Sequence, residues 1–295
     1  MESLRDIRNR INSVQKTMKI TNAMYLMASS KLKKARKALE ETEPYFESLQ
    51  RAISKIILHT DLGSERFFAT DKVIPDAKIR QGYIVITSDR GLAGAYNHNA
   101  CRMAEAELKR HPQAVLFCIG QAGHSYFDRH PEFSFRMDEE YCFSAGTPSL
   151  WQARDLANHI IDLFLSEELD EIHVIYTKMQ NAMLTTTEMI QLLPLHGDLF
   201  PSNKVVETDV YIEDFDPSPS AVLRQVVPNY VKGILYGTMV ESYAAEQNAR
   251  MAAMDSATEN AKEIISNLSL EYNRIRQAAI TTEITEVVSG AAAQE

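Results

Sequence analysis

Three groups of residues carry the side-chain types from which active sites are built. The first is the run Thr87–Asn97, TSDRGLAGAYN, a glycine-containing turn between an expected strand and an expected helix. Amide groups at a helix N-terminus can bind phosphate. Gly91 and Gly94, however, are three positions apart with no third glycine, and the chain contains no GxxxxGK[ST] sequence. We therefore favour a structural turn that Asp89 and Arg90 tie down over a nucleotide site.

Histidines and cysteines form the other two groups. His124 and His130 flank an aromatic segment, but six positions separate them and no third ligand is in register, so helix-end or surface histidines are favoured over a metal site. Cys101, Cys118 and Cys142 form no CxxC pair, and their odd number fits a reducing compartment. No GxSxG nucleophile turn is present. We expect no catalytic residue, no cofactor and no metal.

The elements that would position such residues follow two hydrophobic patterns. In the first, apolar or small residues recur at spacings of three and four from Leu4 to Leu39, extended by 46–56, and again from Met251 to Ala279. Two long helices at opposite ends of a chain pack most simply as an antiparallel coiled coil. Residues 1–40 carry a net charge of +7 and residues 240–295 a net charge of −5, which favours this pairing and sets its orientation.

The second pattern lies between these helices. Short segments that are apolar at nearly every position are typical of strands covered on both faces, and helical stretches alternate with them. The expected strands are Tyr83–Thr87, Ala114–Ile119 and Ile172–Thr177, with Thr185–Leu193 and Thr208–Ile212 as further candidates. The expected helices are Asn97–Arg110, Gln121–Arg129 and Pro148–Ser166. This alternation predicts an open, mostly parallel α/β sheet.

The fold class is therefore α/β with long helices: an antiparallel coiled coil of the N- and C-terminal helices, with an inserted open α/β domain of Rossmann-like type. We expect an N-terminal helix over 1–60, a linker over 61–76, the inserted domain over 77–207, a return loop over 208–219 and a C-terminal helix over 220–295. Pro44 predicts a kink or brief break near Glu43, and Pro228 predicts a break in a short helical turn.

Composition and surface pattern narrow the function classes. The net charge of −9 argues against general nucleic-acid binding. The start, MESLRDIRNR, has no apolar signal region, and no apolar run reaches the ~18 residues that span a bilayer, so we expect a soluble protein. The basic run 31–37 reads as a solvated face or as a contact for phosphate or an acidic protein. Near the C-terminus, apolar residues lie on more than one face of the helix and would need another protein to enclose them. They are Tyr272, Ile275, Ile280, Ile284, Val287 and Val288.

Three sequence blocks resemble the gamma subunits of F-type rotary ATP synthases. They are IRNRINSVQKTMKITNAMYLMASSKLKKA from Ile7, ITSDRGLAGAYNHN from Ile86, and the segment Ala249–Ala293 with its RQAAITTE motif. The resemblance implies a central-stalk rotor whose coiled coil turns inside a ring of three alpha and three beta subunits. The α/β domain would contact the epsilon subunit and the membrane c ring. ATP chemistry would belong to the beta subunits, so the chain would be non-catalytic and peripheral, on the cytoplasmic face of the bacterial cell membrane.

The resemblance also implies particular contact residues. Arg276, Gln277, Thr281 and Glu283 match family positions that hydrogen-bond to a loop of the beta subunit, and Met24 matches the methionine opposite that region. Further implied contacts are Arg8, Arg10 and Lys31, with Ile284, Val287 and Val288 in a hydrophobic sleeve.

Some alternatives stay open. The region Leu195–Val205 contains no inserted cysteine pair, so thiol regulation is not expected. H⁺ and Na⁺ both remain possible as the coupling ion. The other function classes are an enzyme built on the α/β domain, which would bind a nucleotide or substrate as the isolated chain, and a generic coiled-coil tether.

Overall fold

The computed structural model describes residues 3–57, 65–68, 79–130, 135–138, 140–141, 143–181, 184–200 and 215–292. Cys142, the candidate strand Thr208–Ile212 and most of the expected linker and return loop lie outside these ranges. The helices are α1 (Leu4–Ile57), α2 (Tyr96–Arg110), α3 (Gln121–Asp128), α4 (Leu150–Leu165), the 3-10 helix η3 (Gly197–Leu199) and α5 (Pro219–Ala292). The strands are β1 (Gln81–Ile86), β2 (Val115–Ile119), β3 (Arg136–Met137), β4 (Glu171–Met179) and β5 (Thr185–Leu193).

The chain divides into two compact units, and each long helix contributes to both. The first unit consists of residues 1–29 and 250–295, and the second of residues 30–249. This division cuts α1 and α5 in their interiors. The domain boundaries expected from the sequence stay a prediction.

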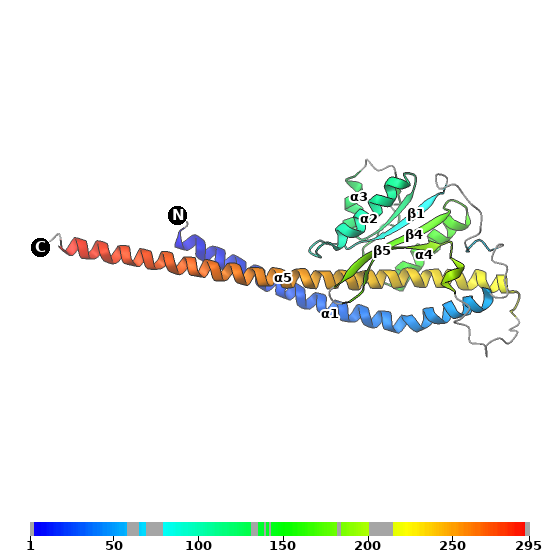
Figure 1. The fold of residues 1–295 in the computed structure, drawn as a ribbon, viewed down its shortest axis with the longest axis horizontal. Helices are drawn as coiled ribbons and strands as arrows, with labels where there is room; N and C mark the ends of the chain where they lie inside the picture. Colours follow the sequence, from blue (N-terminus) through cyan, green and yellow to red (C-terminus); the bar gives the residue numbers. More distant parts are fainter. Residues whose placement is uncertain are drawn as a thin grey trace. The chain divides into compact units, whose positions relative to one another are not determined.

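In the first unit, α1 and α5 run in opposite directions and pack along a seam with a seven-residue repeat (Figure 1). The buried positions of this seam are Ile7, Thr21 and Ala28 on α1, and Met254, Ala261 and Leu268 on α5. The side-chain oxygens of Thr21 and Thr258 lie 2.8 Å apart. The predicted antiparallel coiled coil is confirmed, because a repeat of seven is the one that keeps a seam facing a partner helix.

In the second unit, the same two helices meet at Phe46 and Gly233. A Cβ atom added to Gly233 would overlap the Phe46 ring, so only glycine permits this approach. Phe46 lies 25 positions after Thr21 on α1, and Gly233 lies 25 positions before Thr258 on α5. The antiparallel register is therefore the same in both units.

Both helices continue through their prolines, so the break expected at Pro228 is wrong, and of the kink or brief break expected near Glu43 the break is wrong. α1 is helical through Pro44 and changes direction in its second half (Figure 1). Pro44 is exposed, so water can solvate the carbonyl that lost its amide partner. α5 is helical through Pro228, where Val227 and Val231 on either side are fully buried. Packing of these side chains offsets the lost backbone hydrogen bond.

The sheet has the strand order β3-β2-β1-β4-β5. β1 pairs in parallel with β2 and β4, β2 pairs in parallel with β3, and β5 is an antiparallel edge strand beside β4. The predicted open, mostly parallel sheet is confirmed. Strand β3 was not predicted, because two residues are too few to show a strand pattern.

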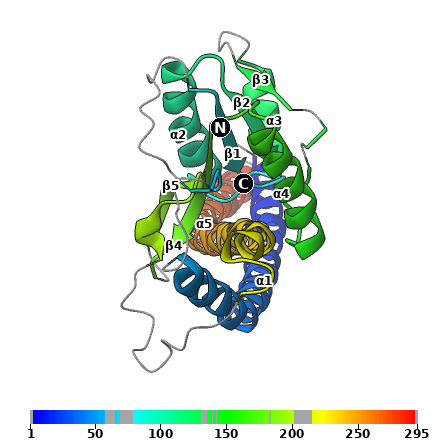
Figure 2. The ribbon, with the colours of Figure 1, turned by 90° about the vertical axis from the view of Figure 1, so that its right-hand side faces the viewer.

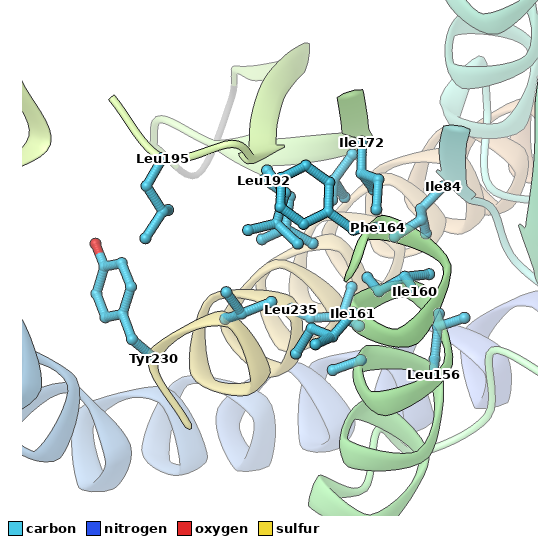
Figure 3. Close-up of a cluster of buried hydrophobic side chains, with 14 of the residues drawn as sticks. Ile84, Leu156, Ile160, Ile161, Phe164, Ile172, Leu192, Leu195, Tyr230 and Leu235 are labelled. Atoms are coloured by element: carbon cyan, nitrogen blue, oxygen red, sulfur yellow. The ribbon is translucent and has the colours of Figure 1, made fainter. Parts of the chain in front are cut away.

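The two faces of the sheet are covered by different helices. Ile84 and Ile86 of β1 point into a core shared with α4, α5 and the end of α1, while Tyr83 and Val85 point into a core shared with α2 and α3. Figure 2 shows α2 on one side of the sheet and α5 on the other. Figure 3 shows Leu235 of α5 facing side chains of α4 and the sheet.

Part of the expected linker belongs to this core. Phe67 and Phe68 are buried in the cluster that contains α4 and α5. The backbone N–H of Leu195 donates to the carbonyl of Phe67 at 2.7 Å. In the sequence, the two adjacent phenylalanines within a polar stretch were the sign that this part of the linker packs into the core.

Candidate functional site

The C-terminal end of α5 has no partner helix among the described residues. Leu4, the first residue of α1, lies 17 positions before Thr21, and Ile275 lies 17 positions after Thr258. In the antiparallel register these two residues are opposite each other. Residues 276–292 therefore extend beyond the start of α1, over about 25 Å at 1.5 Å per residue.

Large apolar side chains are exposed on this extension. The exposed fractions are 46% for Ile280, 58% for Ile284, 71% for Val287 and 62% for Val288. Single exposed apolar residues are common on protein surfaces, but a group on one helix segment marks a surface that another protein covers. The extension is therefore a candidate surface for a partner.

Four of the predicted contact residues lie on the same extension. Arg276, Gln277, Thr281 and Glu283 are all exposed. The Thr281 hydroxyl donates to the carbonyl of Gln277 at 2.9 Å, within the helix. Neither Arg276 nor Glu283 has an ion-pair partner within the part of the chain that the structure describes. Their charged groups are free to bind a partner, and a guanidinium can pair with a carboxylate through two hydrogen bonds.

Polar and apolar residues of the extension share one side of the helix. An α-helix turns by about 100° per residue, so the side chains of these residues spread over an arc of roughly 160° around the helix axis. Its members are Arg276, Gln277, Ile280, Thr281, Glu283, Ile284, Val287 and Val288. One partner surface can therefore contact all of them.

Met24 does not lie opposite Arg276 on the neighbouring helix, while its contact with the beta subunit stays a prediction. The register set by Thr21 and Thr258 places half-buried Met24 opposite Asp255. Asp255 lies 21 positions from Arg276, or about 30 Å along the helix. Heptad periodicity alone does not fix register, because every shift by seven residues satisfies the same pattern.

The three basic residues of the prediction lie on α1 and are divided between the two units. Arg8 and Arg10 are exposed on α1 and lie opposite Glu271 and Ser269 in the same register. Lys31 is exposed but belongs to the other compact unit. The structure thus brings together the predicted residues of α5 and places Met24 apart from them.

The glycine-containing turn after β1 is a structural loop. The Asp89 carboxylate accepts hydrogen bonds from the Ser144 hydroxyl at 2.6 Å, the Ala145 N–H at 2.8 Å and the Gln121 N–H at 3.2 Å. Gln121 is the first residue of α3, so the Asp89 carboxylate holds the turn against the N-terminus of that helix. The predicted role of Asp89 as a tie for the loop is confirmed.

The space beside this turn is too small for a nucleotide. A cavity of about 10 Å³ is lined by residues that include Thr87, Tyr96, Gln152 and Glu246. That volume holds about one water molecule, whereas ligand pockets measure roughly 300–1,000 Å³. Gly120, with φ of +100°, lies against the Thr87 carbonyl and closes the turn further.

The other candidate chemistries find little support in the described residues. Cys101 and Cys118 are buried, and burial raises the pKa of the Cys101 thiol to about 12, which keeps it protonated and unreactive. Within the described ranges, no group of three or more His, Cys, Asp or Glu side chains could hold a metal ion. No helix in those ranges combines the length and hydropathy needed to cross a membrane.

The class of protein is therefore an antiparallel coiled coil of terminal helices with an inserted, mostly parallel α/β domain. A family model described as ATP synthase matches residues 3–294. The ATP synthase gamma chain of Ruminiclostridium cellulolyticum is 39% identical over 298 residues, which cover 99% of each chain. The sodium-ion-specific ATP synthase gamma chain of Acetobacterium woodii is 38% identical over 306 residues, again with 99% of each chain covered. This chain belongs to the ATP synthase gamma chain family.

Solved structures share the fold. A chain of the Euglena gracilis mitochondrial ATP synthase, in a structure of its OSCP, F1 and c-ring parts, superposes with a TM-score of 0.65 at 16% identity and covers 99% of this chain and 94% of that chain. A chain from the central stalk and c ring of the Tetrahymena thermophila mitochondrial ATP synthase gives a TM-score of 0.61 at 23% identity, with 81% and 99% covered.

Proposed function

We propose that this chain is the central-stalk rotor subunit of an F-type ATP synthase. Rotation of the membrane c ring, driven by proton flow, would turn the chain inside a ring of three alpha and three beta subunits. The turning chain would change the conformation of each catalytic beta subunit in sequence, for ATP synthesis or, in reverse, ATP hydrolysis. The chain itself carries out no chemistry.

The observation that carries this proposal is the unpaired extension of α5. Residues 276–292 present exposed apolar side chains next to Arg276 and Glu283, which have no ion-pair partner among the described residues. Burying that apolar surface in a ring of other subunits would be favourable by about 25 cal/mol for each Å² removed from water. A tether between two proteins needs no such extension.

Coupling by rotation follows from the unequal sides of the helix pair. The N-terminal helix region carries a net charge of +7 and the C-terminal region a net charge of −5, so the two sides of the pair differ in charge. A rod of this kind presents a different side to each of three surrounding sites at any moment. Turning it changes the state of every site, which is allosteric coupling by rigid-body rotation.

The remaining partners follow from the same proposal. The α/β domain, expected over 77–207, would contact the epsilon subunit and the c ring, and the complex would lie on the cytoplasmic face of a bacterial cell membrane. One relative at 38% identity is described as sodium ion specific, so ion pumping must be tested with both H⁺ and Na⁺.

The test is ATP-driven ion pumping in vesicles that contain the complex assembled with this chain. We expect hydrolysis of ATP to acidify the vesicles, or to load them with Na⁺, only when the chain is present. Equal pumping without the chain would overturn the proposal. Tight nucleotide binding by the isolated chain, measured by calorimetry, would instead favour an enzyme.

A further inference from the structure

The side chain of Ser242 in α5 joins three elements of the α/β unit. Ser242 is fully buried, and its Oγ lies 2.7 Å from the hydroxyl of Tyr96, the first residue of α2. The same oxygen accepts a hydrogen bond from the backbone N–H of Thr177 in β4 at 3.3 Å. A serine hydroxyl has one proton and two lone pairs, so it can satisfy both groups at once.

Thr177 offers its N–H to α5 because β1 ends before reaching it. The parallel pairing of β1 with β4 runs as far as Val85 and Ile175. Beyond that point β4 continues beside β5 alone, with Thr177 opposite Thr187. Ser242 thus accepts the hydrogen bond from Thr177 that a longer β1 would otherwise accept.

The hydrogen bonds made by Ser242 differ in kind from the apolar part of the α5 interface. Leu223, Val227, Val231, Leu235 and Met239 recur every four residues and lie in the apolar core under the sheet. Rotation of α5 about its axis would take these close-packed side chains out of the core, so they determine which face of the helix is buried, although apolar contacts have no preferred direction of their own.

After Met239 the buried residues of α5 are a mixture of apolar, small and polar ones, among them Tyr243, Ala245 and Gln247. Ala245 packs with Ala93 and Tyr96, which buries little area per turn. Hydrogen bonds weaken steeply when their angle changes. The bonds at Ser242 therefore help to hold the helix in one rotational setting beyond Met239.

Ser242 also lies close to the place where α5 leaves this unit. The unit ends at Ala249, about two helical turns further on. A turning force on the later part of α5 is resisted by the contacts near that exit, which include those of Ser242 and of the buried Glu246, Gln247 and Asn248. We propose that Ser242, with Tyr96 and Thr177, is a positioning residue that fixes the rotational setting of α5 against the α/β domain and so transmits torque between them. This inference rests on the proposed rotor function.

The first experiment measures the hydrogen bond itself in the full chain. Ser242→Ala should make the amide of Thr177 exchange its hydrogen about tenfold faster, because the amide loses its acceptor. Thr238→Val is the matched control, since Thr238 is also buried in α5 but its hydroxyl donates to the Leu235 carbonyl of the same helix at 2.9 Å. Unchanged exchange at Thr177 in the Ser242 variant would overturn the inference.

The second experiment measures coupling in vesicles that contain the assembled complex. The ratio of ions pumped to ATP hydrolysed should fall by about twofold with Ser242→Ala and with Tyr96→Phe, and stay unchanged with Thr238→Val. The effect of the double variant Tyr96→Phe/Ser242→Ala should be smaller than the sum of the two single effects, because both changes remove the bond that Tyr96 and Ser242 share. A merely structural role would lower the melting temperature and leave this ratio intact.

The outcomes separate this inference from the function on which it rests. If the wild-type complex pumps and the Ser242→Ala complex keeps the wild-type ratio despite faster exchange at Thr177, the positioning role is wrong and the rotor stands. If the wild-type complex pumps equally well without the chain, the rotor itself is wrong and the inference falls with it.

Discussion

The hydroxyl groups of Thr21 and Thr258 lie 2.8 Å apart across the seam of the first unit. This contact fixes which residues of α1 and α5 are opposite each other. It places Leu4 opposite Ile275 and leaves the following residues of α5 without a partner helix. The length of the extension, and with it the candidate site, follows from this one register.

Cross-linking tests the register directly. We expect Thr21→Cys with Thr258→Cys to form a disulfide on oxidation in a chain whose three native cysteines are replaced, because the two positions face each other. The matched control is Thr21→Cys with Ile265→Cys, one heptad and about 10 Å further along, beyond the 4.4–6.8 Å Cα separation of a disulfide. A cross-link to position 265 in place of 258, seen by gel mobility, would show a helix pair shifted by one heptad.

Two glycines one turn apart in α5 should respond oppositely to alanine. Gly233→Ala would push a methyl group into the Phe46 ring and should lower the free energy of unfolding by about 1–3 kcal/mol. Gly237→Ala meets no atom within 4 Å and should raise it by up to about 1 kcal/mol, through helix propensity. Urea denaturation of the two variants measures both values. Equal effects would contradict the close approach of α1 and α5 at Phe46.

Buried His173 should make the α/β unit sensitive to acid. Burial, with the nearby His111 and His196, lowers the pKa of His173 to about 4, and its Nδ1 has no hydrogen-bond partner. Because the folded pKa lies below the unfolded value of about 6.5, stability is fully present above pH 6.5 and falls as the pH drops toward 4. Inside that pH window, the free energy of unfolding falls by up to about 1.4 kcal/mol per pH unit.

A variant without the histidine should lose this sensitivity. His173→Phe keeps a ring that can stack on Tyr83, whose centroid lies 5.5 Å away, and removes the unsatisfied nitrogen. We expect higher stability at pH 7 and a flatter profile between pH 6.5 and 4, measured by thermal melts. His98→Gln, at an exposed position of α2, is the control and should leave the profile unchanged. An unaltered acid profile in His173→Phe would mean that another group titrates.

Arg276 should matter more to the assembled complex than other exposed basic residues. Arg276→Ala should remove a charge-assisted contact worth about 1.5–3 kcal/mol, and so weaken assembly or ATP-driven rotation by roughly tenfold or more. Arg274→Ala changes an exposed arginine on another side of the same helix, about 160° away. Lys37→Ala changes a lysine whose exposed ion pair with Glu41, at 3.6 Å, is worth little. Equal activity of all three complexes would contradict the assignment of Arg276.

The sequence predicted the elements well because their patterns are local. Alternation of short apolar strands with helices determined the sheet, and the three-four repeat determined the helix pair. Features that depend on distant partners were missed. Pro44 and Pro228 are breakers by propensity, but packing and solvation hold both helices together.

The site was predictable to a smaller extent. The residues from Arg276 to Val288 lie together because they share one stretch of helix, which a sequence shows directly. Met24 was placed opposite the region of Arg276 from the family resemblance, and a heptad pattern contains no information on register that could have tested this placement; the contact between Thr21 and Thr258 does. The Ser242 cluster was missed because Tyr96, Thr177 and Ser242 are distant in sequence and carry no recognisable motif.

Rotation of the chain inside its complex is the most direct test of the account. A probe attached at the exposed position 98 of α2 can be followed while the beta subunits hydrolyse ATP, with the ring fixed to a surface. The account predicts that the probe turns in one direction, with one step for each beta subunit, and that a covalent cross-link between residue 276 and the ring stops both rotation and hydrolysis. Steady hydrolysis at the full rate with a stationary probe would contradict it.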